Sequence, residues 1–189
     1  MLRLAPRLAP VAAPRLAEIA AQLGSDVPAQ LDPGPSIATG AGDVLEPLAP
    51  LPAYGILVLT QPFPLSTASV YHAADRLGLP RSAGELEQLH AGLAAALPGA
   101  LPADLIVNDL QPAAVSLAPP ISDAVSTARH AGADHALVCG SGPTVIGVYR
   151  GADGIERAAA AAAALPETVL RPVVAAPVGR GVARPMANE

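Results

Sequence analysis

The spacing of hydrophobic residues along the 189-residue chain predicts helices interleaved with short strands. An amphipathic helix places its apolar residues at positions i, i+3, i+4 and i+7. Residues 14–23 carry this pattern in Leu16, Ile19, Ala20 and Leu23. Gly24 follows directly and is a typical helix end, so we expect the first helix to stop there.

The same helical spacing returns four times farther along the chain. We expect these helices over about residues 67–77, from Ser82 through Leu93, over 121–131 and over 155–165. Ser82 followed by Glu85 has the spacing of a capping box, which marks a helix start. A further helix is expected after the segment 108–110, interrupted at Pro119.

Strands are expected where apolar runs are too short for helices. These runs cover residues 54–60, 134–139, 145–149 and 168–175. Residues 32–52 are rich in proline and glycine and contain only short extended pieces, such as residues 36–39. The mixture of strands and helices, with one strand–turn–strand unit, predicts an α+β sandwich with helices on one face of an antiparallel sheet.

The composition is that of a globular chain of one domain, or one and a half. Hydrophobic residues make up 51% of the chain and charged residues 14%, against roughly 25% charged in an average domain. Prolines and charges interrupt every candidate membrane span, so no stretch reaches 18 apolar residues. We therefore expect no membrane partner.

Charge and cysteine content exclude several classes of site. All 11 basic residues are arginines, and the absence of lysine excludes a Walker A loop and a lysine Schiff base. The net charge of −5 argues against non-specific nucleic-acid binding. The one cysteine, Cys139, excludes an internal disulfide and a cysteine-cluster zinc site, and we expect a buried, inert thiol. The four histidines show no metal-ligand spacing, so no metal site is predicted.

Three segments could carry chemistry, and each also has a plainer interpretation. Asp26, between Gly24 and Pro28, could face a cleft or be an exposed turn residue. The hydroxyl residues of the segment 65–71 could bind an anion or only cap a helix. The glycines of the segment 140–144 could allow close approach to a phosphate or form an ordinary tight turn.

Taken in order, these segments resemble motifs of the GHMP kinases, and within that family the branch that phosphorylates 4-diphosphocytidyl-2-C-methyl-D-erythritol. Each motif alone is weak, whereas five in family order are fairly specific. The matching segments are Leu23-Gly-Ser-Asp-Val-Pro28, Thr39-Gly-Ala-Gly-Asp43, Ser66-Thr-Ala-Ser-Val-Tyr71, Asn108-Asp-Leu110 and Gly140-Ser-Gly-Pro-Thr144. Departures from the family pattern are Ala29, Pro35, Gln111 and Cys139.

The resemblance implies phosphorylation of a small-molecule hydroxyl in isoprenoid precursor synthesis, with ATP and Mg²⁺, in the cytoplasm. By this resemblance Asp26 is the catalytic base, Thr67 lies beside the substrate, and Tyr71 stacks on the cytosine. Support of the nucleotide-binding loop is implied for Gly140, Ser141, Gly142, Pro143 and Thr144.

The resemblance also implies a domain layout. It places a remnant of the amino-terminal kinase domain at 14–52 and a ferredoxin-like carboxy-terminal GHMP kinase domain at 53–178. Outside these we expect a poorly ordered, proline-rich leader (1–13) and a tail (179–189). No glycine precedes Gly24, and the family's phosphate loop and amino-terminal lysine are absent. We therefore expect a truncated kinase, inactive without an amino-terminal half. The alternatives are a non-catalytic or partner-dependent α+β module, and a GHMP kinase for another small alcohol.

Overall fold

The computed structural model describes residues 12–97, 102 and 105–177, and the chain divides into two compact units. The first unit comprises Met1–Leu51 and Val178–Glu189, and the second comprises Pro52–Pro177. The leader predicted for residues 1–13 lies, apart from residues 12 and 13, outside the described residues, as does the predicted tail.

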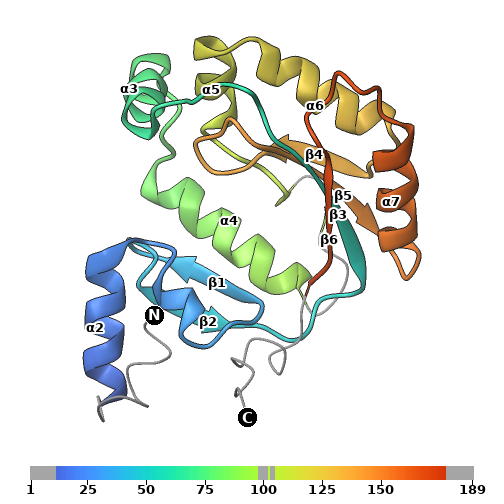
Figure 1. Cartoon of the computed structure of the whole chain (residues 1–189). Helices are drawn as coiled ribbons and strands as arrows, with labels where there is room; N and C mark the ends of the chain where they lie inside the picture. The colour runs from blue at the N-terminus through green and yellow to red at the C-terminus, as the bar shows by residue number, and fades with distance from the viewer. Residues whose placement is uncertain (1–11, 98–101, 103–104, 178–189) are drawn as a thin grey trace, which may run out of the picture. The chain divides into compact units, whose positions relative to one another are not determined.

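The described part of the first unit, residues 12–51, contains a helix, a short turn of helix and a hairpin (Figure 1). Helix α2 (Ala13–Leu23) confirms the predicted helix, and η2 (Pro28–Gln30) follows it. Strands β1 (Ser36–Thr39) and β2 (Val44–Pro47) form a two-stranded antiparallel sheet. Within its described part, this unit buries fully only Ala20 and Pro28.

The second unit is built on a four-stranded antiparallel sheet. Its strands are β3 (Tyr54–Leu59), β4 (His135–Val138), β5 (Val145–Arg150) and β6 (Val173–Ala175), in the order β4-β5-β3-β6. All three strand pairs are antiparallel, as expected. The central pair β3–β5 runs in register from Tyr54 opposite Arg150 to Leu59 opposite Val145.

Among the described residues of this unit, five helices accompany the sheet, and the layers are visible in Figure 1. They are α3 (Thr67–Leu77), α4 (Ala83–Ala96), α5 (Gln111–Leu117), α6 (Pro120–His130) and α7 (Gly154–Ala164). Helices α6 and α7 pack on the face of the sheet to which the fully buried residues of β3 and β5 point. The predicted α+β architecture, with helices on one face of an antiparallel sheet, is therefore confirmed.

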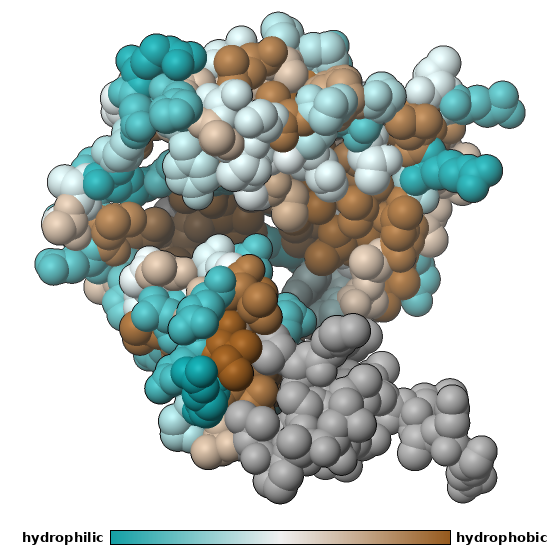
Figure 2. Space-filling model, turned by 60° about the vertical axis from the view of Figure 1, so that its left-hand side comes forward, coloured by the Kyte–Doolittle hydropathy of each residue, from teal (hydrophilic) through white to brown (hydrophobic). Residues whose placement is uncertain are grey.

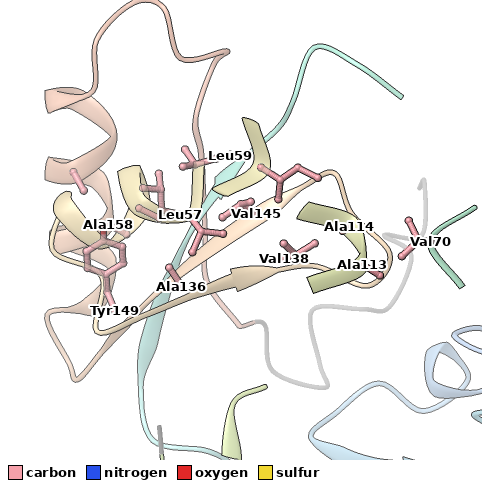
Figure 3. Close-up of a cluster of buried hydrophobic side chains, with 14 of the residues drawn as sticks. Leu57, Leu59, Val70, Ala113, Ala114, Ala136, Val138, Val145, Tyr149 and Ala158 are labelled. Atoms are coloured by element: carbon pink, nitrogen blue, oxygen red, sulfur yellow. The ribbon is translucent and has the colours of Figure 1, made fainter. Parts of the chain in front are cut away.

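One hydrophobic core joins the sheet to α3, α5, α6 and α7, whereas α4 contributes no buried residue. In Figure 3, Leu57, Leu59 and Val145 lie in the middle of the cluster, with Ala114 and Val70 toward one end. Tyr149 and Ala158 lie at the other end (Figure 3). The buried helix residues are mostly small: Ala73, Ala74, Ala113, Ala114, Ala128, Ala158 and Ala161. Small side chains let the helices approach the sheet closely, as dense core packing requires.

Two expectations about this unit were wrong. The last strand begins at Val173 rather than residue 168, because Pro166 and Val169 form a turn and Pro172 has no N–H to donate. Cys139 is exposed rather than buried, because it stands one residue beyond β4, where the chain leaves the sheet.

Hydrophobic residues also remain on the surface. Figure 2 shows brown patches among paler and teal residues on the face in view. The large apolar side chains that are exposed include Leu23, Tyr71, Leu77, Leu86 and Val173. Within the described part of the chain, no helix is both long enough and apolar enough to cross a membrane.

Candidate active site

The start of helix α3 presents hydroxyl and aromatic side chains to solvent. Ser66 caps the helix, and its hydroxyl oxygen accepts a hydrogen bond from the Ser69 N–H at 3.3 Å. The core-facing side of the helix carries Val70, while Thr67 and Tyr71 are exposed one turn apart. Tyr71 is 55% exposed, so its ring is available to a ligand rather than part of the core.

The segment Gly140–Thr144 connects β4 to β5 as a tight loop. The Cys139 N–H donates to the Thr144 carbonyl at 2.8 Å, and the Gly142 N–H donates to the Cys139 carbonyl at 3.0 Å. Gly140 and Gly142 have φ values of 57° and 80°, which favour glycine. A Cβ at Gly142 would also lie 3.0 Å from Val138 Cγ1. The glycines therefore follow from the geometry of the loop.

The structure brings this loop and the start of α3 together. Thr67 Oγ1 and Ser141 Oγ lie 2.9 Å apart and share a hydrogen bond, although 74 positions separate them in the chain. Leu65, just before the helix, also lies close to Gly142. Two of the three candidate segments thus form one surface.

Residues 108–111, which are not among the three candidate segments, hold the loop in place. The Asn108 side-chain amide donates to the Val138 carbonyl at 2.9 Å and to the Gly140 carbonyl at 2.7 Å. Its own oxygen accepts from the Leu110 N–H at 3.0 Å. Gln111 Oε1 accepts from the Val138 N–H at 2.9 Å. The resemblance includes Asn108 and Leu110 in a motif and gives Gln111 as a departure from the family pattern, but the partners of these residues follow only from the fold.

A bidentate ion pair anchors the neighbouring residue of that segment. Arg81 donates from Nε and Nη2 to the two carboxylate oxygens of Asp109, at 2.5 and 2.7 Å. This hydrogen bonding and the charge of Asp109 raise the pKa of Arg81 above its usual value. The next residues form the predicted capping box, in which Ser82 and Glu85 exchange hydrogen bonds. These bonds lower the pKa of Glu85.

Asp26 belongs to the first unit, where it is exposed in the turn between α2 and η2. Within the turn, the Val27 N–H donates to the Gly24 carbonyl at 3.1 Å. The β1–β2 turn lies against this segment: a Cβ at Gly42 would be 2.3 Å from the Ser25 carbonyl oxygen. Gly42 is therefore needed for the close approach of two motifs that the sequence showed only as separate matches.

A separate electrostatic cluster joins β4, β5 and α7. Asp134 accepts from both Nη atoms of Arg157, at 3.2 and 3.1 Å, and from the Arg150 N–H at 2.6 Å. The bond to Arg157, with that to the Arg150 N–H, lowers the pKa of Asp134. Burial raises the pKa of Tyr149, whose ring lies 5.5 Å below the Arg157 guanidinium.

An open groove of about 830 Å³ runs beside this cluster between α6 and α7. It is lined by residues such as Thr127, His130, Arg157 and Ala161. Neither Thr67, Tyr71 nor the Gly140–Thr144 loop lines it. We therefore place the candidate site at the loop and α3, where two of the motifs meet, and not in this groove.

Comparison with known proteins identifies the second unit. Residues 86–168 match the family model "GHMP kinases C terminal". The chain is 40% identical over 135 residues to a 4-diphosphocytidyl-2-C-methyl-D-erythritol kinase of Streptomyces avermitilis, covering 68% of this chain and 44% of that protein. The protein of the same name from Pelotomaculum thermopropionicum is 36% identical over 130 residues, covering 67% and 44%.

A solved structure is similar as well. The crystal structure of a 4-(cytidine 5'-diphospho)-2C-methyl-D-erythritol kinase superposes with a TM-score of 0.66 at 29% identity, covering 93% of this chain and 60% of that one. The chain spans 44% of the length of the two curated relatives named above. The second unit is therefore similar to the carboxy-terminal domain of the GHMP kinases, and the chain is similar to part of the 4-diphosphocytidyl-2-C-methyl-D-erythritol kinases.

Proposed function

We propose that this chain provides the acceptor-binding part of a kinase that phosphorylates 4-diphosphocytidyl-2-C-methyl-D-erythritol with ATP and Mg²⁺. The observation that carries the proposal is the contact between Thr67 and Ser141, which joins two motifs of that kinase into one surface. The exposed Tyr71 ring one helical turn away provides a stacking surface beside them. The names of the relatives supply the substrate.

In this proposal, Tyr71 stacks on the cytosine ring and Thr67 hydrogen-bonds at the edge of the same pocket. Base–aromatic stacking contributes about 1–3 kcal/mol where it has been measured in single-strand binding. The Gly140–Thr144 loop supports the nucleotide side of the site. Its two glycines allow the backbone to approach a phosphate closely, which fits this role.

Asp26 is proposed as the general base. Its exposed carboxylate in a turn can accept the proton of the substrate hydroxyl as the oxygen attacks the γ-phosphorus of ATP and the bond to the ADP oxygen breaks. Mg²⁺ neutralises charge on the phosphates in such transfers and is usually held by one or two carboxylates, phosphate oxygens and water. The described residues contain no group of three or more His, Cys, Asp or Glu side chains able to hold a metal by themselves.

The proposal is limited to what these 189 residues contain. The chain has no lysine, and residues 1–23 contain no glycine. We therefore assign two tasks to this chain, recognition of the acceptor and removal of its proton. In nucleotide binding we assign to the chain only the support given by the Gly140–Thr144 loop. On this assignment, we propose that phosphate transfer requires additional nucleotide-binding residues.

The test measures binding of cytidine diphosphate to the 189-residue chain by NMR titration, with ligand concentrations up to the millimolar range. We expect saturable shifts of the Thr67, Tyr71 and Ser141 amide signals. Tyr71→Leu, which keeps an apolar side chain but has no π-face, should weaken binding at least about fivefold, the factor for a 1 kcal/mol loss. Tyr71→Phe keeps the ring and should bind as the unaltered chain does.

A control variant tests whether the effect is specific to Tyr71. His72→Ala removes an exposed ring from the next position of α3 and should leave the affinity unchanged. A chain that shows no saturable shift, or a Tyr71→Leu variant with unchanged affinity, would overturn the assignment of this surface to the cytidine end of the substrate.

A further inference from the structure

We propose that Asn108 is a positioning residue of this site, which fixes the Gly140–Thr144 loop so that Ser141 meets Thr67. The inference rests on the proposed function for its meaning in catalysis. The geometry that supports it is independent of that function, because it concerns contacts within the second unit alone.

Asn108 uses its whole side-chain amide at the point where β4 becomes the loop. A side-chain amide has two N–H donors and one carbonyl acceptor. Both donor contacts are made from Nδ2, to the carbonyls of Val138 and Gly140, which flank Cys139. The acceptor contact, to the Leu110 N–H, holds the side chain in its own segment. Asn108 therefore spans the last residue of the strand and the first residue of the loop.

These contacts matter because β4 lies at the edge of the sheet. The Val138 N–H donates to Gln111 and the Val138 carbonyl accepts from Asn108, so both groups point away from β5. Nearer the start of the strand, His135 Nε2 lies 2.6 Å from the Ile106 carbonyl. The segment 106–111 thus lies beside this edge of β4 and binds the outward backbone groups of Val138 through two side chains.

The residue that Asn108 holds is directly next to the candidate site. Gly140, held by Asn108, is followed directly by Ser141, whose hydroxyl lies 2.9 Å from Thr67 Oγ1. Asp at position 108 has the same shape but lacks both N–H donors and places a carboxylate against two carbonyl oxygens. We expect the loop to move away and the Ser141–Thr67 bond to break, while the sheet and its core remain.

The experiment compares Asn108→Asp with Asp109→Asn in the 189-residue chain. The control makes the reverse chemical change at the adjacent residue, whose carboxylate binds Arg81 rather than the loop. Native-state hydrogen exchange is measured at the Cys139 and Gly142 amides, which bond within the loop, and at the amides of β3. In Asn108→Asp we expect exchange at the loop amides to be about tenfold faster and exchange in β3 to be unchanged. The control should match the unaltered chain at the loop amides.

Cytidine diphosphate affinity supplies the second readout, and Asn108→Ala replaces Asn108→Asp if the latter does not fold. We expect weaker cytidine diphosphate binding in the Asn108 variant and unaltered binding in the control.

Unchanged loop exchange would overturn the inference, as would an equal acceleration of all amides, since Asn108 would then serve overall stability only. Faster loop exchange with unaltered affinity would also overturn it as a positioning role. An unaltered chain that binds no cytidine diphosphate would refute the proposed function instead, and loop exchange would still decide whether Asn108 fixes the loop.

Discussion

At the scale of single residues, the candidate site depends on side chains that are ordinary in type and specific in position. Thr67 and Tyr71 are exposed, and Asn108 is part-buried with each of its polar side-chain atoms in a hydrogen bond. The contrast separates the residues that are free to touch a ligand from the residue that holds the loop. Substitutions at the two kinds of position should therefore differ in their effect on stability.

The two glycines of the loop allow a matched test of this geometry. Both have positive φ, but a Cβ at Gly140 would meet nothing within 4 Å, whereas one at Gly142 would lie 3.0 Å from Val138 Cγ1. We expect Gly140→Ala to destabilise the second unit by about 1 kcal/mol, the cost of the backbone conformation alone. Gly142→Ala should cost more, because either Val138 or the loop must also shift.

Urea unfolding followed by tyrosine fluorescence measures both variants. All three tyrosines, at positions 54, 71 and 149, lie in the second unit, and the chain has no tryptophan. Equal free energies of unfolding for the two variants would show that the contact with Val138 has no energetic weight.

Residue patterns predicted some of this site and missed the rest for a physical reason. The capping box at Ser82 and Glu85 was predictable, because its partners are three positions apart. The bond between Thr67 and Ser141 joins residues 74 positions apart, and that between Asn108 and Val138 joins residues 30 apart. Such contacts are set by tertiary packing, so local spacing shows neither of them.

At the scale of elements, helix boundaries were predictable where a cap and a glycine fix them. Helix α3 begins after Ser66 and ends before Gly78, which has a left-handed φ of 67°, and its predicted range was 67–77. Strand β6 was predicted too long, because its apolar pattern continues through residues that the turn at Pro166–Val169 removes from the sheet. Hydrophobic spacing therefore identified the element but not its start.

Asp134 links three elements, and its titration should appear in the stability of the fold. Its pKa is lowered in the folded state from an ordinary value of 3.8, mainly by the hydrogen bonds from Arg157. Its contribution is therefore fully present above about pH 4 and is lost as the pH falls through the lower, folded-state pKa. Since both side chains are about a third exposed, solvent screening keeps this contribution near 1 kcal/mol or less.

The measurement compares unfolding free energies at pH 7 and pH 3 for the unaltered chain and for Asp134→Asn. We expect the difference between the two proteins to be largest at pH 7 and smaller at pH 3. Glu167→Gln, at an exposed acid in the turn before β6, is the control for removal of one surface carboxylate from this unit. A pH-independent effect of Asp134→Asn would assign its role to hydrogen bonding without charge.

At the scale of the whole molecule, the second unit contains all that a folding domain requires. Every residue of the hydrophobic core cluster lies between Pro52 and Pro177. The described part of the first unit buries fully only Ala20 and Pro28. A chain folds independently when it holds its own core, so the two units should differ in autonomy.

We therefore expect a fragment of residues 52–177 to fold alone. Its urea transition should be cooperative and should have the same midpoint as the tyrosine-detected transition of the full chain, since both report the same core. A fragment of residues 12–51 should show little ordered structure by circular dichroism. A non-cooperative transition in residues 52–177 would mean that the first unit contributes to the stability of the second.

The shielding of β4 also bears on how this protein behaves at high concentration. An open strand edge can recruit the backbone of another molecule and so begin aggregation. At β4, the side chains of Asn108 and Gln111 already satisfy the outward N–H and carbonyl of Val138. At the opposite edge, β6 offers only three residues, Val173–Ala175. Edge-to-edge aggregation is thus opposed at one side by the occupied backbone groups of Val138 and at the other by the shortness of the strand. Loss of the Asn108 amide would free the Val138 carbonyl for intermolecular pairing.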